Sequence, residues 1–231
     1  MRAPKVTILG IGNVLWADEG FGVRTVETLH RSHVFPDNVT LMDGGTQGIY
    51  LVQHVQAADI LVVFDAVDYG LAPGTLKLIE DADVPNFMGA KKMSLHQTGF
   101  QEVLAMAELL GDYPKHILLV GVQPEELEDY GGSLRPCVRA QIGPAIDAAL
   151  RWLDARGIDY EKRTSPLPEE AGLHPQQLDL AAYEAYRPNA AAACRAGDER
   201  VLRDASVTFD PKPVDLGNKR MSVNVDSRRK D

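Results

Sequence analysis

The sequence contains few cysteines, no long hydrophobic run and fewer basic than acidic residues. Its two cysteines, Cys137 and Cys194, are too few for a disulfide framework, and their spacing does not match a metal site. No apolar stretch reaches the ~18 residues that a membrane-spanning helix needs, and the apolar run near the N-terminus is too short for a signal peptide. These absences argue against a disulfide-stapled secreted domain and against membrane insertion, and they favour a cytoplasmic protein.

Charge and composition limit the class of partner and the number of domains. The 231 residues include 33 acidic and 24 basic side chains, for a net charge of −9, so nucleic acid is not an expected partner. A hydrophobic content of 45% is typical of a soluble protein with a sizeable core. After Gly157 prolines are scattered and sustained periodicity is lost, apart from a possible short helix near 178–186. We therefore predict an α/β domain at residues 1–157 and a poorly ordered C-terminal extension at residues 158–231.

Apolar runs alternate with helical patterns along the predicted domain, which indicates an α/β fold. The strand-like runs lie at residues 6–10, 39–43, 60–64, 75–79 and 116–121. The helical patterns lie at residues 22–33, 49–57, 100–110 and 136–156. In the last of these, Gly143-Pro144 is expected to kink or restart the helix, because proline removes a hydrogen-bond donor and clashes with the preceding turn. The β-α-β-α-β order at the start predicts a three-layer α/β/α sandwich with a mostly parallel, twisted sheet of about five strands.

The helix predicted at residues 22–33 has one apolar and one charged face. The apolar face, which is expected to be buried, carries Val23, Val26 and Leu29. The opposite face, which is expected to face water, carries Arg24, Glu27 and Arg31. Further along the chain, His174 in the predicted extension is interpreted as a solvated or structural side chain.

The glycines after the first predicted strand invite comparison with a dinucleotide-binding loop. The segment is Gly10-Ile11-Gly12-Asn13-Val14-Leu15, and Leu15 occupies the position at which the dinucleotide fingerprint needs its third glycine. The helix also does not begin directly after the turn, because residues 16–21 intervene. Asp43, at the end of the second strand, could take the place of the acid that binds the ribose. A dinucleotide-binding α/β enzyme therefore stays open as an alternative.

Acidic and histidine side chains follow several of the predicted strands. They are Asp18 and Glu19 after the first strand, Asp43 and Asp65 at the ends of the next two, and His96 in a later loop. Because the loops after parallel strands lie along one edge of the sheet, these side chains can converge. Two carboxylates and one imidazole suit a divalent transition metal, whereas carboxylates alone would favour magnesium or calcium. Each residue also has a structural interpretation, as a helix cap, a turn residue or a surface side chain.

Covalent catalysis by a serine or cysteine is not expected. Ser94 lacks the glycines of a nucleophile elbow. Cys137 is predicted to begin a helix, and no base lies near it in the sequence pattern.

Taken in order, the stretches around these residues resemble the nickel–iron hydrogenase maturation proteases. The resemblance covers about residues 5–157, and the order and spacing of the stretches make it more specific than any one of them. The extension after residue 157 has no counterpart in the family pattern. The matching stretches are Ile8-Leu9-Gly10-Ile11-Gly12-Asn13, Asp18-Glu19-Gly20-Phe21-Gly22-Val23-Arg24, Asp43-Gly44-Gly45-Thr46-Gln47-Gly48, Phe64-Asp65-Ala66-Val67, Pro73-Gly74-Thr75, Ser94-Leu95-His96-Gln97 and Val120-Gly121-Val122-Gln123-Pro124.

This resemblance implies a cytoplasmic endopeptidase, a hydrolase that removes a short C-terminal extension from the precursor of the hydrogenase large subunit. Glu19, Asp65 and His96 match the metal-contacting residues of the family, and the nickel would be supplied by the substrate, with no organic cofactor. Recognition of the nickel would make unloaded precursors poor substrates. Asp43 or Asp65 would act as general base on water, as an aspartyl-type peptidase does, or the ion would activate the water. A non-catalytic chaperone of the same precursor remains the alternative.

Overall fold

The computed structural model describes residues 2–88 and 95–187, and the main sheet in that part of the chain has five strands. The strands are β1 (Val6–Ile11), β3 (Val39–Gly45), β4 (Ile60–Ala66), β5 (Leu76–Glu80) and β6 (His116–Val122). Their order across the sheet is β3-β1-β4-β6-β5. All neighbours pair in parallel except β5, which pairs antiparallel with β6 at one edge. The prediction of a mostly parallel sheet of five strands is confirmed.

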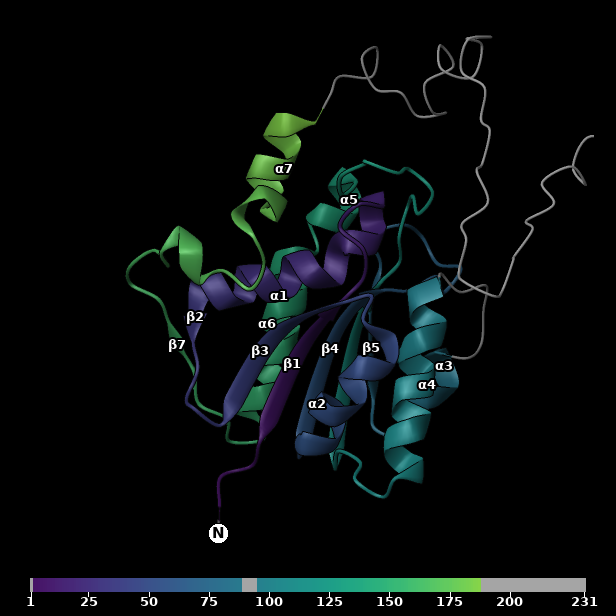
Figure 1. Ribbon diagram of the computed structural model, residues 1–231, viewed down its shortest axis with the longest axis vertical. Coiled ribbons are helices and arrows are strands. Elements are labelled where there is room, and N and C mark those ends of the chain that lie inside the picture. The colour runs from purple at the N-terminus through teal and green to yellow at the C-terminus, as the bar shows by residue number, and fades with distance from the viewer. Residues whose placement is uncertain (1, 89–94, 188–231) are drawn as a thin grey trace, which may run out of the picture. The chain divides into compact units, whose positions relative to one another are not determined.

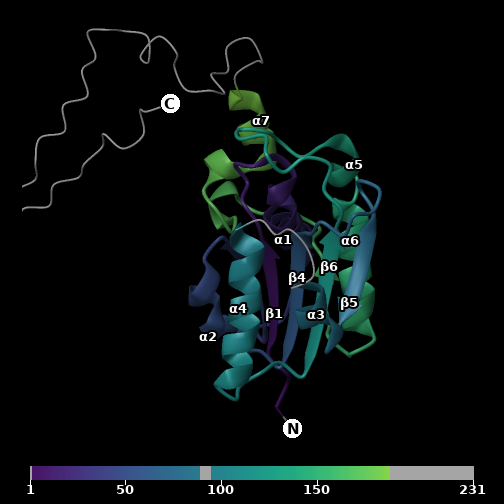
Figure 2. The same cartoon turned by 90° about the vertical axis from the view of Figure 1, so that its right-hand side faces the viewer.

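Helices cover both faces of this sheet, as Figures 1 and 2 show. One face packs against α1 (Phe21–Ser32) and α6 (Ile142–Asp154), and the other packs against α2 (Val52–Ala57), α3 (Asp83–Met88) and α4 (Leu95–Leu109). Each face has its own apolar core, so the three-layer α/β/α sandwich is confirmed. In the described part of the chain, no helix combines the length and the apolar character that crossing a bilayer requires. The shorter helical elements are η1 (Ala17–Gly20), η2 (Gly48–Leu51), α5 (Pro136–Arg139), η3 (Glu169–Ala171) and η4 (Gln176–Leu178).

The side chains of the central strand β4 alternate between the two cores. Val62 and Phe64 belong to the core beneath α1 and α6, whereas Leu61 and Val63 belong to the core beneath α2 and α4. Every residue of β4 is buried, which explains why this run is apolar almost throughout. The same alternation turns the next odd-numbered residue, Asp65, toward the α4 side of the sheet.

The helix predicted at residues 136–156 is interrupted, but earlier than expected. α5 ends at Arg139 and α6 begins at Ile142, so Pro144 lies in the first turn of α6 rather than at the break. An N–H in the first turn of a helix has no partner within the helix, and proline is therefore tolerated there. The helix therefore restarts next to Gly143-Pro144, as predicted, although the break itself lies before these two residues.

Residues 158–187, the first part of the predicted extension, are described and contact the α/β unit. β7 (Glu161–Lys162) pairs with β2 (His33–Val34), and the short helix predicted near residues 178–186 is α7 (Leu180–Tyr186). Residues 169–187, here called the covering segment, make hydrogen bonds and ion pairs with α1. Residues 188–231 lie outside the described residues, and the division of the chain at residue 157 stays a prediction.

The prediction that the charged face of α1 points into water is wrong for Arg24 and Glu27. Their residues are only 4% and 6% exposed, because the covering segment lies over them. Arg24 donates a hydrogen bond to the carbonyl of Leu178, and its guanidinium lies over the ring of Tyr183. Burial lowers the pKa of Arg24, although nearby acidic groups oppose this shift. An amphipathic pattern shows which face of a helix is polar, and a later segment has covered that face here.

The first turn of α1 lies directly on the backbone at the ends of β1 and β4. A Cβ atom at Gly22 would overlap with the carbonyl oxygens of Phe64 and Ile11. Only glycine allows the helix to approach the two strands so closely. This contact determines how closely α1 packs on the sheet near the C-terminal ends of the parallel strands.

We expect Gly22→Ala to destabilise the fold by about 3 kcal/mol, because the backbone at this contact cannot yield without moving two strands. Gly143→Ala is the matched control: Gly143 also lies in the first turn of a helix, and no atom in the described part of the chain lies within 4 Å of a Cβ placed there. The control should be neutral or slightly stabilising. Urea unfolding measures both changes, and equal effects of the two substitutions would contradict the tight contact at Gly22.

Candidate active site

Asp65 lies at the C-terminal end of β4, on the face of the sheet that α4 covers. It is 0% exposed and pairs in register with Gly121 of β6. Its Oδ1 atom accepts a hydrogen bond from the N–H of Ala66 at 2.8 Å. The hydroxyl of Tyr69 lies against Gly121, where a side chain would overlap with it. Burial raises the pKa of Tyr69, and the negative charge of Asp65 raises it further, so a protonated phenol accompanies this carboxylate.

Glu19 lies in η1, the short turn that joins the glycine turn after β1 to the start of α1. η1 contacts β4, and Glu19 is half-buried. The neighbouring Asp18 is fully buried and accepts hydrogen bonds from the backbone N–H groups of Glu125 and Glu126 at 2.9 Å each and of Arg135 at 2.6 Å. Asp18 therefore holds η1 against the loop after β6. Glu19, the next residue, is the half-buried acid of η1 at the edge of the sheet.

Gln123, directly after β6, holds the loop that follows β4. Its Oε1 atom accepts hydrogen bonds from the backbone N–H groups of Tyr69 at 2.8 Å and Leu71 at 3.1 Å, and its Nε2 donates to Asp68 Oδ1 at 3.0 Å. An amide can donate and accept at once, which a carboxylate cannot. Sequence reasoning included Gln123 only as part of a family stretch. The available signal was a polar residue between a buried strand and a proline.

His96 lies in the first turn of α4, and not in a loop as we predicted. α4 begins at the edge of the sheet where the parallel strands end, as Figure 2 shows. The backbone of His96 is therefore at the same edge as Asp65 and Glu19. The side chain of His96 lies outside the described part of the chain.

Asp43 lies on the opposite face of the sheet from Asp65. Leu41 packs with the core beneath α1 and Met42 with the core beneath α4, so the alternation along β3 turns Asp43 toward α1. β1 also runs between the two aspartates, because it pairs with β3 on one side and with β4 on the other. Two carboxylates share a proton only at very short separation. Asp43 and Asp65 are therefore not a pair of the pepsin type, and either one would act without the other.

The surroundings of Asp43 favour its neutral form. Burial raises the pKa of this carboxyl, and interactions with His174 and Arg24 only partly oppose the shift. The pKa of Asp43 thus moves toward the range that suits a general base near neutral pH.

Cys137 is not arranged as a nucleophile. Its thiol donates a hydrogen bond to Glu125 Oε2 at 2.9 Å. This hydrogen bond raises the pKa of the Cys137 thiol, and burial adds to the shift. A reactive cysteine needs a lowered pKa, so the expectation that this residue is not the nucleophile agrees with its environment.

The glycine turn after β1 does not have the geometry of a dinucleotide site. α1 begins at Phe21 rather than directly after the turn, and η1 fills the intervening space. A Cβ atom at Gly12 would overlap with the carbonyl oxygen of Glu19. The backbone of η1 thus lies where a pyrophosphate would have to approach the helix.

The fold and the site define an α/β protein with carboxylates gathered at the ends of its parallel strands. A family model described as hydrogenase maturation protease matches residues 23–152. The hydrogenase expression/formation protein HupD of Thiocapsa roseopersicina is 62% identical over 203 residues, which are 88% of this chain and 92% of that protein. The hydrogenase 2 maturation protease of Escherichia coli is 40% identical, over 67% of this chain and 94% of that protein.

A solved structure agrees with these matches. The hydrogenase maturating endopeptidase HybD from E. coli superposes with a TM-score of 0.66 at 38% identity, and the match covers 69% of this chain and 98% of that one. The chain belongs to the hydrogenase maturation proteases and is an endopeptidase, as the resemblance implied. The match to HupD covers 88% of this chain, and a continuous match of that length must include residues 158–187. This part of the chain is therefore shared with that relative.

We expect Asp18→Ala to destabilise the protein by roughly 3 kcal/mol, because three buried N–H groups would lose a charged acceptor at once. Glu19→Gln, in the same turn, is the control and should change stability by less than about 0.5 kcal/mol. Chemical unfolding measures both. A loss at Asp18 no larger than that of the control would contradict its role in holding η1 to the loop after β6.

Asp43→Asn should raise the melting temperature at pH 7. The folded protein holds the proton of Asp43 more tightly than the unfolded chain does, because its pKa is raised above the ordinary value of 3.8. As the pH rises above this value, ionisation of Asp43 therefore lowers the free energy of unfolding. The gain should disappear at pH 3. Asp59→Asn is the opposite control: the pKa of Asp59 is lowered, first by a hydrogen bond from the Lys5 N–H, so this substitution should cost stability at pH 7. Thermal melts of both variants at the two pH values test the sign.

Proposed function

We propose that this protein removes the C-terminal extension of the large-subunit precursor of a nickel–iron hydrogenase, in the cytoplasm, after nickel has been inserted. In this proposal Glu19, Asp65 and His96 recognise the nickel ion that the substrate carries. The observation that supports it most is the contact between η1 and the end of β4, because it brings the elements of Glu19 and Asp65 together at the edge where α4 begins.

The donor set fits this task. Two carboxylates and an imidazole bind a borderline divalent ion such as nickel when other ligands complete its coordination. The precursor would supply those other ligands, so an unloaded precursor would lack the ion that these three residues contact. Discrimination would then come from the difference in binding between loaded and unloaded substrate. Since Asp65 is fully buried, the residues that cover it would have to move when the ion enters.

Hydrolysis requires a base that takes a proton from water while the water oxygen attacks the scissile carbonyl carbon. The proton then passes to the leaving amine as the peptide bond breaks. Asp65 and Asp43 are the two proposed bases. Asp65 is on the α4 side with the elements of the proposed nickel-contacting residues. Asp43, whose pKa is raised by burial, lies on the α1 side. The substrate nickel could instead lower the pKa of the attacking water.

The test mixes purified protein with nickel-loaded or unloaded precursor and follows the mass of the precursor over time. Wild-type protein should shorten only the loaded form. Asp65→Asn, His96→Ala and Glu19→Gln should each reduce kcat/KM by about 100-fold or more. His116→Ala is the control, because His116 is exposed at the start of β6, at the opposite edge of the sheet, and it should process the precursor normally.

The outcomes separate the parts of the proposal. Equal processing of loaded and unloaded precursor would contradict nickel recognition while leaving the peptidase activity in place. Normal processing by all three site variants would contradict the site. Stable binding of the loaded precursor by wild-type protein with no loss of mass would favour the chaperone alternative. Asp43→Asn, compared with Asp65→Asn on substrate that is already bound, reports which carboxylate the chemical step needs.

A further inference from the structure

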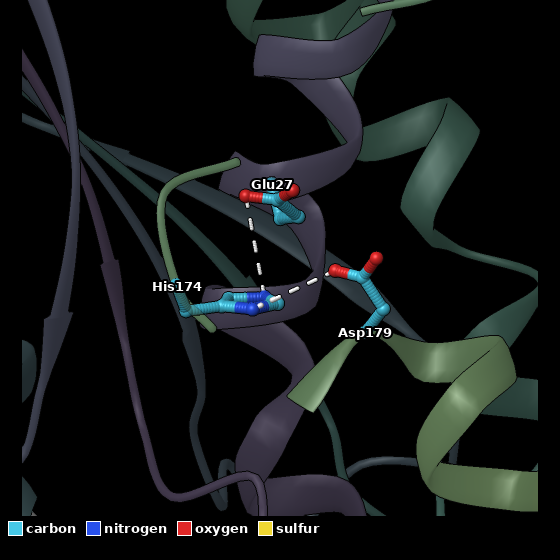
Figure 3. Close-up of side chains that lie close together, drawn as sticks. All are labelled: Glu27, His174 and Asp179. Carbon is cyan, nitrogen blue, oxygen red and sulfur yellow. Dashed lines mark ion pairs between the residues drawn. The ribbon is translucent and has the colours of Figure 1, made fainter. Parts of the chain in front are cut away.

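Three side chains with metal-binding atoms meet where the covering segment crosses α1, away from Glu19, Asp65 and His96. Glu27 comes from α1, and His174 and Asp179 come from the covering segment (Figure 3). One ligand atom from each lies within 4.8 Å of the other two. The cluster is on the α1 side of the sheet, whereas Asp65 faces the α4 side. It was not predicted as a site, because His174 was interpreted as solvated or structural.

The imidazole of His174 is held in an orientation that suits a metal ligand. Its side chain is only 3% exposed. Nδ1 lies 3.3 Å from the carbonyl oxygen of Pro175, to which it can donate, and 3.7 Å from Asp179 Oδ1. Donation from Nδ1 to a backbone carbonyl fixes the tautomer and leaves the lone pair on Nε2. Metal-binding histidines are commonly oriented in this way.

The Nε2 atom of His174 is buried and has no hydrogen-bond partner among the residues that the structure describes. It faces Glu27 Oε2 at 4.0 Å, which is too long for a hydrogen bond. In the tautomer that Pro175 favours, two electron-pair donors therefore confront each other inside the protein. A buried arrangement of this kind is unfavourable unless a positive charge lies between the two atoms. A metal ion at about 2.0–2.2 Å from each would meet that need with a small inward movement of the side chains.

Arg31 and a backbone N–H hold the two carboxylates in place. Arg31 Nε contacts Glu27 Oε1 at 2.6 Å, and Arg31 also donates to both oxygens of Asp179 at 3.1 Å. The N–H of Leu173 donates to Glu27 Oε2 at 2.8 Å. Each carboxylate oxygen keeps a second lone pair for an ion. Outer contacts of this kind orient ligands around a metal, so Arg31 supports the site although it adds positive charge nearby.

We propose that Glu27, His174 and Asp179 bind one divalent transition ion of the zinc–nickel class, with water in the remaining position. One nitrogen and two carboxylate oxygens form a donor set that zinc accepts in a tetrahedral arrangement. Because Glu27 belongs to α1 and the other two ligands belong to the covering segment, the ion joins the segment to the helix. The ion is held by the protein itself, separately from the nickel that the substrate would carry.

The test uses the full-length chain, treated with EDTA, dialysed and titrated with zinc chloride by calorimetry. Bound zinc is counted by elemental analysis after free metal has been removed. Wild-type protein and Glu19→Gln should bind the ion alike, because Glu19 is not a ligand of this site. His174→Gln should bind it about 100-fold more weakly or not at all. Zinc should raise the melting temperature of the first two proteins and leave that of His174→Gln unchanged.

A second variant and the pH dependence keep the proposal falsifiable if His174→Gln fails to fold. Asp179→Asn changes a side chain that is 23% exposed, and it should keep the fold and lose most of the affinity for zinc. Binding of equal strength in wild type and both variants would overturn the site. The absence of zinc uptake by wild-type protein would also overturn it. So would a melting temperature that rises on acidification and does not respond to zinc, because a protonated His174 would then bridge the two carboxylates without an ion.

Discussion

The contact between the first turn of α1 and the backbone of β1 and β4 determines where the loops of the candidate active site lie. Gly22 permits this contact, because any side chain would overlap with the carbonyl oxygens of Ile11 and Phe64. Because α1 packs so closely against the ends of β1 and β4, the chain between β1 and α1 must fold into the tight turn η1. The carbonyl of Glu19 then occupies the place of a missing side chain at Gly12, whose φ is 135°. Glu19 is thus positioned by the packing of its own backbone.

Two buried polar side chains fix the neighbouring loops, and neither is proposed to touch the substrate. Asp18 accepts three backbone hydrogen bonds from the loop after β6, and Gln123 satisfies two N–H groups of the loop after β4. A loop at the edge of a sheet has backbone groups that no strand can satisfy, and a buried side chain supplies the partner. Asp18 therefore holds the turn that carries Glu19, and Gln123 holds the loop that follows Asp65.

Much of this arrangement follows from the sequence. The apolar runs of β1, β4 and β6 are buried on both faces, so their pattern is unambiguous, and a parallel sheet brings their following loops to one edge. The face on which a strand-end carboxylate lies could not be predicted in the same way. Asp43 and Asp65 both end strands, but they fall on opposite sides of the sheet, because the alternation along each strand has to be combined with the register between strands.

The covering of α1 was also beyond reach of the sequence pattern. The charges of Arg24 and Glu27 predict a polar face, and they are equally consistent with solvent and with a polar partner. Residues 169–187 have little hydrophobic periodicity, since they attach to α1 chiefly through hydrogen bonds and ion pairs. A segment held by polar contacts leaves no apolar stripe, so its order is not visible in composition.

The covering segment also affects the chemistry of Asp43 from the far side of α1. It brings His174 into the surroundings of this carboxyl, and burial is the largest cause of the raised pKa of Asp43. A base of higher pKa is stronger, provided that enough of it is ionised at the working pH. The segment therefore supplies His174, whose interaction with Asp43 favours the ionised form, while burial favours the neutral form more strongly. A metal ion bound by His174 would add positive charge at this point and would lower the pKa of Asp43, so an ion at the proposed site would change the basicity of this carboxylate.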